Sequence, residues 1–469
     1  MAPSHPTSVP PGTFARLRNW GQRFAATVLP ARGGGDAGRP GVGASGDLQT
    51  LLRESRMEHG GEISARDRAE RIAAIYRGAE TARREVILDA ISREFTPDRE
   101  ALEGAIAAMT AAASEDERGH AEARMRLALG APRAKFFAQF NLLPEGVKFL
   151  VDLRADLLGF LAHGHALDVL RVELDGLLES WFDPGFLELR RITWQSPALV
   201  LEKLIVNEAV HPIESWDDLR NRLDLDRRCY AFFHPRMPSE PLIFVEIALL
   251  KGLPGKVQAL LDQRAPVQDV RAADTAVFYS ISNAQKGLRG ISFGNLLLKR
   301  VIEDLRRDLP WLKTYATLSP LPGFRKWLDR ALAERRGLSA ADDSKLAAVL
   351  GHPDPGAVLA DALAREEWPA GGRIADAIRE PMEKLCARYL LQEKLGRNPL
   401  DPVAHFHLNN GARVNRLFWL ADSSPRGLRQ SYGMMASYRY DLSEVERNHE
   451  EFLQSGRIAA ARRVKRLID

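Results

Sequence analysis

A glycine-bearing loop with cationic side chains is the segment of this chain that most clearly suggests ligand binding. Its sequence is QKGLRGISFG, with Gly287, Gly290 and Gly294 spaced along it and Lys286 and Arg289 beside them. Glycine allows the backbone to approach a ligand closely. A helix that follows such a loop presents free N–H groups to an anion. The pattern predicts an anion-binding loop, although a tight turn between a strand and a helix has the same composition.

The same loop contains the pattern Gly-x-Ser-x-Gly, in which Ser292 is the central residue. In serine hydrolases this pattern places the nucleophile on a turn directly after a strand. Here the polar residues NAQK already end the preceding strand, and the later acid and histidine, Asp401 and His407, are only six residues apart. A serine hydrolase that uses Ser292 is therefore the weaker alternative.

Two histidines, His405 and His407, alternate with Phe406 in the segment VAHFHLNNGA. On an extended segment both imidazoles would face the same side, and such a pair could bind a metal. The sequence has no HExxH motif and no further Cys/His cluster to complete a metal site. A single catalytic histidine is the better functional interpretation, because imidazole titrates near neutral pH.

Ser319 lies between a β-prone run and a double-proline turn in YATLSPLPGF. Pro320 disfavours the α conformation in the residue before it, so Ser319 is expected to be extended and to mark the end of a strand. Ser-Pro is common in turns. From the spacing alone, a structural role for this hydroxyl is favoured over a functional one.

The elements that must position these residues differ between the two halves of the chain. Apolar residues recur at helical spacing over residues 46–187, for example at Leu153, Leu157 and Leu161, and predict a helical bundle without a catalytic constellation. Residues 1–45 are rich in Pro, Gly, Ala and Arg and are predicted to be a disordered tail. A transit peptide would have a similar composition.

Residues 188–469 have the alternating strand and helix signals of an α/β or α+β sheet domain. After the glycine loop, Leu297, Val301 and Leu305 predict the inner face of a helix. Residues 338–396 return to helical patterning and are predicted to be an insertion. The predicted strands, in chain order, are RRCYAFFHP, EPLIFVEIALL, TAVFYSIS, KTYATLS, RVNRLFWLAD and MMASYRYDL.

Composition limits the classes of partner. The chain has 469 residues, 66 basic and 62 acidic, and this small basic excess does not indicate a nucleic-acid-binding surface. No run approaches the ~20 apolar residues of a membrane span, so no membrane partner is expected. The two cysteines, Cys229 and Cys386, are far apart and suit a reducing compartment.

Several long segments together resemble the malonyl-CoA decarboxylase family, over about residues 50 to 445. The resemblance implies a helical N-terminal domain used in oligomer assembly and a catalytic domain of the acetyltransferase (GNAT) type. It further implies malonyl-CoA as substrate and a homo-oligomer, expected to be a tetramer. The segments that carry it are HPIESWDDLRNRLDLDRRCYAFFHP, EPLIFVEIAL, TAVFYSISNAQKGLRGISFGNLLLKRVIEDL, LSPLPGF, HFHLNNGA and YGMMASYRY.

The resemblance also assigns site residues. It implies a catalytic pair, Ser319 and His407, and it matches Tyr440 in SYRY to an active-site tyrosine of the family. Ser319 is then functional rather than structural, which reverses the interpretation from spacing. The implied acyl-CoA-binding loop consists of Arg289, Gly290, Ile291, Ser292, Phe293, Gly294 and Asn295.

The implied reaction removes CO₂ from malonyl-CoA and leaves a thioester enolate that must be protonated on carbon. We expect His407 to donate that proton. A free hydroxyl is a poor base, so Ser319 is expected to hydrogen-bond the substrate carboxylate and to relay with His407. No metal or organic cofactor is needed, because the thioester itself accepts the electron pair.

Two other classes of protein remain as alternatives. An acyl-CoA N-acyltransferase would share the fold and the loop, and a non-catalytic acyl-CoA-binding protein would not need His407. The expected location is the cytoplasm, or the mitochondrial matrix if the tail is a transit peptide. The chain ends in RLID rather than in the peroxisomal tripeptide of animal relatives.

Overall fold

The computed structural model describes residues 43–57, 61–130, 132–161, 167–291 and 296–468. The chain divides into two compact units, Met1–Thr50 and Leu51–Asp469. Of the first unit, the structure describes only the beginning of helix α2 (Gly43–Arg56). Residues 1–42 of the predicted tail lie outside the described residues.

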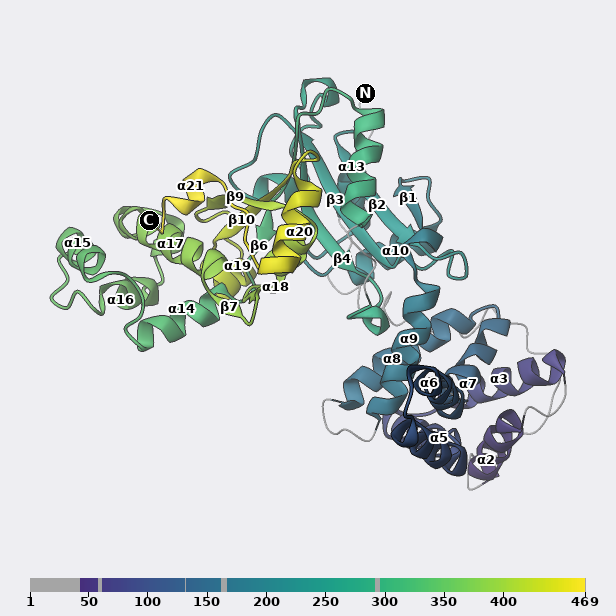
Figure 1. Ribbon diagram of the computed structural model, residues 1–469. Coiled ribbons are helices and arrows are strands. Elements are labelled where there is room, and N and C mark those ends of the chain that lie inside the picture. Colours follow the sequence, from purple (N-terminus) through teal and green to yellow (C-terminus); the bar gives the residue numbers. More distant parts are fainter. Residues whose placement is uncertain (1–42, 58–60, 131, 162–166, 292–295, 469) are drawn as a thin grey trace, which may run out of the picture. The chain divides into compact units, whose positions relative to one another are not determined.

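The N-terminal part of the larger unit is helical, as the apolar spacing predicts (Figure 1). The predicted stripe is buried at Leu153 and Leu157. Side chains define helix starts, since Asp98 accepts hydrogen bonds from two backbone N–H groups of α5 and Ser114 accepts one from α6. The helices are α3 (Glu62–Arg77), α4 (Thr81–Glu94), α5 (Arg99–Ala111), α6 (Glu115–Leu129), α7 (Pro132–Ala138), η1 (Gln139–Leu142), α8 (Gly146–Leu161) and α9 (Asp168–Trp181).

Within the described residues, an eight-stranded sheet follows this helical part. Its order is β1-β2-β3-β4-β5-β10-β6, and β9 pairs with β10. Strands β4 and β5 are parallel, while the other pairs are antiparallel. The strands are β1 (Glu188–Ile192), β2 (Arg227–Phe233), β3 (Ile243–Leu250), β4 (Thr275–Asn283), β5 (Thr314–Thr317), β6 (Ser319–Pro320), β9 (Arg413–Phe418) and β10 (Met435–Tyr440).

The predicted strands are present, but β1 was not predicted. Its sequence ELRRI is mostly charged and lacks the β-branched and aromatic enrichment on which such predictions depend. The strand lies at the edge of the sheet order, where charged residues are common because they oppose pairing with other chains.

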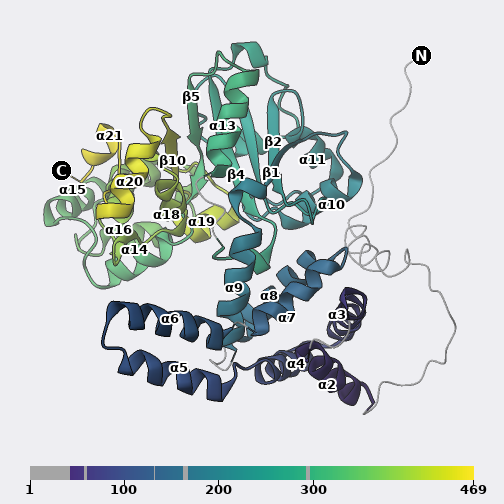
Figure 2. The ribbon, with the colours of Figure 1, turned by 45° about the vertical axis from the view of Figure 1, so that its right-hand side comes forward.

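Helices cover and flank the sheet (Figures 1 and 2). Val301 and Leu305 are buried on α13, as predicted, whereas the side chain of Leu297 is outside what the structure describes. The predicted helical stretch 338–396 contains α15, α16 and α17. Its assignment as an insertion stays a prediction, and so does the domain boundary between residues 187 and 188. The helices are α10 (Ala198–Asn207), α11 (Trp216–Arg222), α12 (Gln258–Leu261), α13 (Leu296–Asp308), α14 (Phe324–Ala333), α15 (Ala340–Leu350), α16 (Val358–Ala364), α17 (Arg373–Leu391), α18 (Pro402–Asn409), α19 (Pro425–Ser431), α20 (Val445–Ser455) and α21 (Arg462–Lys465).

One part of the sheet core lies where β3, β4, β9 and β10 meet. Ala248, Val277, Phe418 and Met435 pack together there, and all four are buried. This core fixes the relative positions of β4 and β10, the strands that carry much of the site described below. Among the described residues, no helix combines the length and the apolar composition that crossing a bilayer requires.

Candidate active site

His407 lies on helix α18 rather than on an extended segment, so the geometry that would let His405 and His407 form a metal-binding pair is absent. Asp401 begins the helix by accepting hydrogen bonds from the N–H groups of Val403 and Ala404, at 3.0 and 2.9 Å. On a helix, residues two apart face different sides. His407 is buried, whereas the half-buried His405 contacts the ring of Phe452.

The hydroxyl of Ser319 lies beside the imidazole of His407. Ser319 Oγ is 3.0 Å from His407 Nε2 and 2.8 Å from Thr317 Oγ1. Ser319 is extended, as its position before Pro320 predicts, and belongs to β6, where it pairs with Ala436 of β10. Two residues 88 positions apart in the sequence are therefore brought together by the sheet and α18.

Tyr440 completes a chain of hydrogen bonds on the other side of the imidazole. Its hydroxyl is 2.8 Å from His407 Nδ1. Burial raises the pKa of Tyr440 well above its ordinary value, so the phenol keeps its proton and can donate it to Nδ1. The structure thus brings together Ser319, His407 and Tyr440, from β6, α18 and β10.

The hydrogen bonds around Thr317 set the direction of this chain. Thr317 Oγ1 accepts from the N–H of Tyr438 at 3.0 Å and from the hydroxyl of Ser319. These two donors use both lone pairs of the oxygen. With its proton directed at Thr317, Ser319 accepts the Nε2–H of His407, while Nδ1 accepts the proton of Tyr440. Thr317 was not predicted as a site residue, although it lies two residues before Ser319 on the same extended segment.

Burial also determines the charge of His407. Desolvation lowers the pKa of this imidazole from 6.5 to about 3. The ring stacks on Tyr438, with centroids 4.5 Å apart and an angle of 24° between the planes. His407 is therefore neutral at neutral pH, which differs from the expectation that it titrates there, because that expectation used the pKa of a solvated imidazole.

A cavity of about 230 Å³ opens onto Ser319 and His407. Most of its wall is apolar, and the polar exceptions include Ser280 and Asn283 at the end of β4. A small, mostly apolar cavity with a few convergent polar groups is typical of a binding site for a small ligand. The other residues that line it are Val210, Ile243, Phe278, Tyr279, Ile281, Pro320, Pro402, Val403 and Phe406.

A larger cavity of about 450 Å³ lies elsewhere, beside α14 and α16. Its polar groups are largely paired with one another, since Tyr432 donates to Asp329 and the guanidinium of Arg325 lies over the ring of Tyr432. None of the predicted site residues that the structure describes lines it. The candidate residues Ser319 and His407 instead line the smaller cavity.

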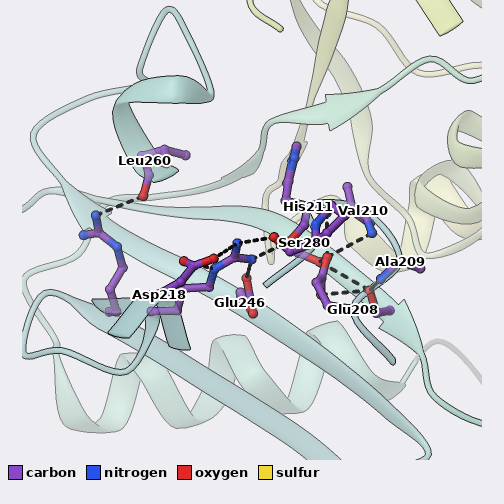
Figure 3. A network of polar contacts seen from close by, with 12 residues as sticks. Glu208, Ala209, Val210, His211, Asp218, Glu246, Leu260 and Ser280 are labelled. Atoms are coloured by element: carbon purple, nitrogen blue, oxygen red, sulfur yellow. Dashed lines mark hydrogen bonds and ion pairs between the residues drawn. The ribbon is translucent and has the colours of Figure 1, made fainter. Parts of the chain in front are cut away.

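A buried polar network supports one wall of the smaller cavity (Figure 3). Glu208 accepts hydrogen bonds from the N–H groups of Val210 and His211, at 2.9 and 2.8 Å, and from the hydroxyl of Ser280 at 2.7 Å. Its second oxygen accepts from Ser282 at 3.0 Å. The network ties Val210 and Ser280, which line the cavity, to one carboxylate. Glu208 was not predicted, although the alternation of Ser280 and Ser282 on a strand places both hydroxyls on one face and so signals a shared polar partner.

A second part of the network lies next to it and joins α11 to β3 (Figure 3). Arg222 donates to both carboxylate oxygens of Asp218, at 2.9 and 3.1 Å, and to Glu246 at 3.1 Å. Burial raises the pKa of Glu246 to about 8, while the guanidinium opposes this shift. These residues lie outside the lining of the cavity, and their contacts indicate a role in holding α11 on the sheet.

The glycine loop continues directly from β4, whose end lines the cavity. Lys286 and Arg289 are exposed, and Gly290 has a φ of +86°, a conformation that glycine adopts readily. Ile291 is buried. The remaining predicted loop residues, Ser292, Phe293, Gly294 and Asn295, lie outside the described residues.

The acid of the hydrolase alternative is used elsewhere. Asp401 caps α18 and accepts a hydrogen bond from the hydroxyl of Tyr389 at 3.2 Å. Both ring nitrogens of His407 face hydroxyl groups, those of Ser319 and Tyr440. Asp401 is therefore not the hydrogen-bond partner of His407, and a Ser292–His407–Asp401 triad would lack its acid.

Groups of three or more His, Cys, Asp or Glu side chains that could hold a metal ion are not found in the part of the chain that the structure describes. The chemistry that this cavity offers is that of two hydroxyls and a neutral imidazole in one hydrogen-bonded chain. Such a chain can orient a substrate and move a proton.

Comparison with known proteins covers both halves of the chain. The family model described as malonyl-CoA decarboxylase C-terminal domain matches residues 185–469, and that described as malonyl-CoA decarboxylase N-terminal domain matches residues 95–182. The mitochondrial malonyl-CoA decarboxylase of Anser anser anser is 37% identical over 418 residues, which cover 85% of this chain and 83% of that protein. That of Rattus norvegicus is 38% identical over 361 residues, or 74% and 73% of the two chains.

Solved structures give the same result. The crystal structure of malonyl-CoA decarboxylase from Rhodopseudomonas palustris aligns with a TM-score of 0.80 and 41% identity, and it covers 90% of this chain and 99% of that one. The enzyme from Agrobacterium vitis also aligns with a TM-score of 0.80, at 39% identity over 90% of this chain and all of the other. The helical N-terminal region followed by a mixed α/β sheet is thus confirmed as the fold.

Proposed function

Because the chain belongs to the malonyl-CoA decarboxylase family, we propose that it converts malonyl-CoA to acetyl-CoA and CO₂ at Ser319, His407 and Tyr440. It is a carboxy-lyase of that family. The observation that carries the assignment of these residues is the continuous hydrogen-bonded chain Tyr440–His407–Ser319, in which His407 and Ser319 line the 230 Å³ cavity.

The reaction breaks the bond between the carboxylate carbon and the α-carbon. CO₂ leaves, and the electron pair stays on the α-carbon and is delocalised into the thioester as an enolate. Acetyl-CoA then forms when that carbon takes a proton. The substrate carboxylate is ionised at neutral pH, so one proton is consumed from solvent for each CO₂ released.

In our proposal His407 delivers this proton as a neutral imidazole. Its Nε2–H passes to the enolate carbon while Nδ1 takes the proton of Tyr440. One solvent proton then goes to Nε2 and the Nδ1 proton returns to Tyr440, which restores the starting tautomer. The ring carries one proton on Nε2, and the Tyr440 hydroxyl offers a second one to Nδ1, so this relay does not need a charged histidine. Burial keeps His407 neutral, so the ring can accept on Nδ1 as it donates from Nε2.

Ser319 has a different task. Its hydroxyl proton points to Thr317 and can turn toward a substrate carboxylate in the cavity. A hydroxyl that donates to the carboxylate orients the bond to be broken. The same oxygen contacts Nε2 and so holds the imidazole in position between turnovers.

The acyl-CoA-binding loop is proposed to be Arg289–Asn295, with Lys286 beside it. Exposed cations on a glycine-bearing loop that leads into a helix suit the phosphates of coenzyme A. The loop follows β4, and the end of β4 lines the cavity, so the thioester end of the substrate would lie next to Ser319.

We also propose that the helical part forms a homo-oligomer, expected to be a tetramer. Helices α5 and α6 form a hairpin in which, among the described residues, only Ala105 and Ala121 are buried. Several of its large apolar side chains are exposed, including Ile106, Leu127 and Leu129. A second copy of the chain would cover this apolar surface, and such assemblies are usually closed and symmetric.

Location in the cell stays a proposal. We favour the cytoplasm, and the mitochondrial matrix is the alternative in which residues 1–45 act as a transit peptide. The relatives from Anser anser anser and Rattus norvegicus are named as mitochondrial, which supports the alternative. Microscopy of the full chain and of a variant without residues 1–45, each fused to a fluorescent protein, distinguishes the two.

One assay tests the function against its rivals. The purified chain is incubated with malonyl-CoA alone, and CO₂ and acetyl-CoA are measured. Equal yields of both are expected. Malonyl transfer that occurs only when an amine is added would support the N-acyltransferase, and binding without turnover would support the non-catalytic alternative.

A further inference from the structure

The glycine loop packs against the helical part of the chain at Gly287. A Cβ atom on this residue would lie 1.7 Å from the carbonyl oxygen of Val151 on α8. Backbone therefore contacts backbone here, and a side chain would not fit. The short 3-10 helix η4 (Lys286–Leu288) that contains Gly287 is thus held against α8, within the unit Leu51–Asp469.

Arg154, one turn further along α8, makes a second connection. Its side chain is 3% exposed. Its Nη1 donates to the carbonyl oxygens of Gly287 and Arg289, at 2.6 and 2.9 Å. Two carbonyls on either side of Leu288 are thereby tied to one guanidinium.

The guanidinium is itself held from the opposite side. Its Nε donates to Asp175 on α9 at 2.6 Å, and the other oxygen of Asp175 accepts from Arg171 at 2.9 Å. A buried charge is costly unless it is paired and hydrogen-bonded. Here the carboxylate provides the charge partner, and Nη1 is directed at the loop.

We propose that Arg154 is a positioning residue for the acyl-CoA-binding loop, so that helices α8 and α9 set the affinity for substrate. This inference rests on the proposed function of the loop. It gives the helical part a role at the site beyond oligomer assembly. Arg154 does not line the catalytic cavity, so it acts on binding through the backbone at Gly287 and Arg289 rather than on the proton transfer.

The chain offers a matched control in Arg133. Its side chain is 6% exposed and pairs with Glu173 of α9 at 2.9 Å. It also donates to a backbone carbonyl, that of Ser92, at 2.9 Å. Arg133 thus resembles Arg154 in burial, ion pair and carbonyl bond, but its contacts stay inside the helical part.

The test compares Arg154→Gln with Arg133→Gln in the full chain. We expect Arg154→Gln to raise KM for malonyl-CoA and Kd for free CoA by about tenfold, the effect of losing a buried bond to a charged group. Its kcat should stay within about twofold, because the interaction acts on binding. Arg133→Gln should lower the Tm similarly and leave KM and Kd unchanged.

Hydrogen exchange gives a readout that does not depend on turnover. Backbone amides of residues 286–291 should exchange faster in Arg154→Gln than in the wild type, and at the wild-type rate in Arg133→Gln. If Arg154→Gln does not fold, Arg154→Lys and Asp175→Asn are measured in the same way. The inference is overturned if the two variants, Arg154→Gln and Arg133→Gln, show the same Kd for free CoA and the same hydrogen-exchange rates at residues 286–291. Failure of the proposed function would instead appear in the wild type, as absence of CO₂ release.

Discussion

Both ring nitrogens of His407 face a hydroxyl group, and this arrangement selects one tautomer. Tyr440 keeps its proton because burial raises the pKa of the phenol, so it donates to Nδ1, and Nε2 carries the proton of the neutral ring. That proton is directed at Ser319, at the wall of the cavity. The side chains of Ser319, His407 and Tyr440 are therefore uncharged at the start of the proton delivery that we propose.

The first prediction separates proton delivery from substrate binding. Tyr440→Phe should lower kcat by about 100-fold, and His407→Asn should lower it further, because general acid–base groups typically contribute 10²–10⁴. Kd for malonyl-CoA should change little in both variants, since the proton is needed only after binding. Steady-state kinetics and calorimetric titration measure the two quantities. A Tyr440→Phe enzyme with wild-type kcat would contradict the relay.

The second prediction concerns the pH dependence of stability. The pKa of His407 is about 3 in the folded chain and close to 6.5 when it is exposed by unfolding. Between these values the unfolded chain binds the extra proton, so the stability gained from the neutral ring is complete above pH 6.5 and is lost as the pH falls toward 3. The contribution is at most about 1.4 kcal/mol per pH unit.

His407→Asn provides the comparison, because asparagine does not titrate. Between pH 7 and 4.5 the Tm of the wild type should fall more steeply than that of the variant, with other buried histidines contributing equally to both. Parallel curves would mean that His407 has an ordinary pKa in the folded chain. In that case a protonated imidazole would be the donor.

At the scale of elements, composition predicted the central strands β2, β3 and β4 and the helical part, because their apolar patterns are long and regular. The helix that carries His407 was not predicted. The metal-pair interpretation of His405 and His407 assumed an extended segment, but Asp401 followed by Pro402 is a helix start, and the capping hydrogen bonds of Asp401 determine the conformation there.

The candidate site could be predicted only in part. Spacing favoured a structural role for Ser319, and only the resemblance to a family assigned it a function together with Tyr440. Thr317 and Glu208 were missed because their roles depend on partners far along the chain: 121 residues separate Thr317 from Tyr438, and 72 separate Glu208 from Ser280. A local pattern such as Ser280 and Ser282 can signal that a polar partner exists, but it does not identify a partner so far along the chain.

The third prediction compares two glycines of the loop. Gly287→Ala should destabilise the chain and raise KM for malonyl-CoA, because its Cβ would overlap the Val151 carbonyl. At Gly290 a Cβ would meet nothing within 4 Å, and only the φ of +86° opposes a side chain. Gly290→Ala should therefore cost about 1 kcal/mol or somewhat more of stability.

A larger side chain at residue 290 can then be used to test the loop itself. Gly290→Val places a branched side chain where the backbone is proposed to approach the phosphates, and it should weaken binding of every CoA thioester. Calorimetry with free CoA measures this effect. Unchanged affinity in Gly290→Val, in a chain with a nearly normal Tm, would exclude the loop as the binding element.

At the scale of the whole molecule, the helical part has two proposed roles, positioning the acyl-CoA-binding loop and forming the oligomer. Different residues serve each role. Arg154 and Gly287 connect α8 to the loop, whereas the exposed apolar side chains lie on the α5–α6 hairpin. A truncated chain that starts near residue 188 would lose both roles, and it would also expose the loop surface that α8 covers. We expect such a chain to be smaller and poorly soluble, and for that reason it cannot separate the two roles.

The last prediction separates them with point substitutions. Ile106→Glu combined with Leu127→Glu places charges on the hairpin, at side chains that are 49% and 80% exposed. Light scattering should show a multimer for the wild type and a smaller species for the double variant, because a charge in a covered apolar interface is costly. The Tm of the protomer should change little, and KM should stay close to the wild-type value because Arg154 is intact. Leu225→Glu, at a residue that is 74% exposed outside the helical part, should leave the multimer unchanged. A wild-type monomer would refute the oligomer, and the helical part would then serve the loop alone.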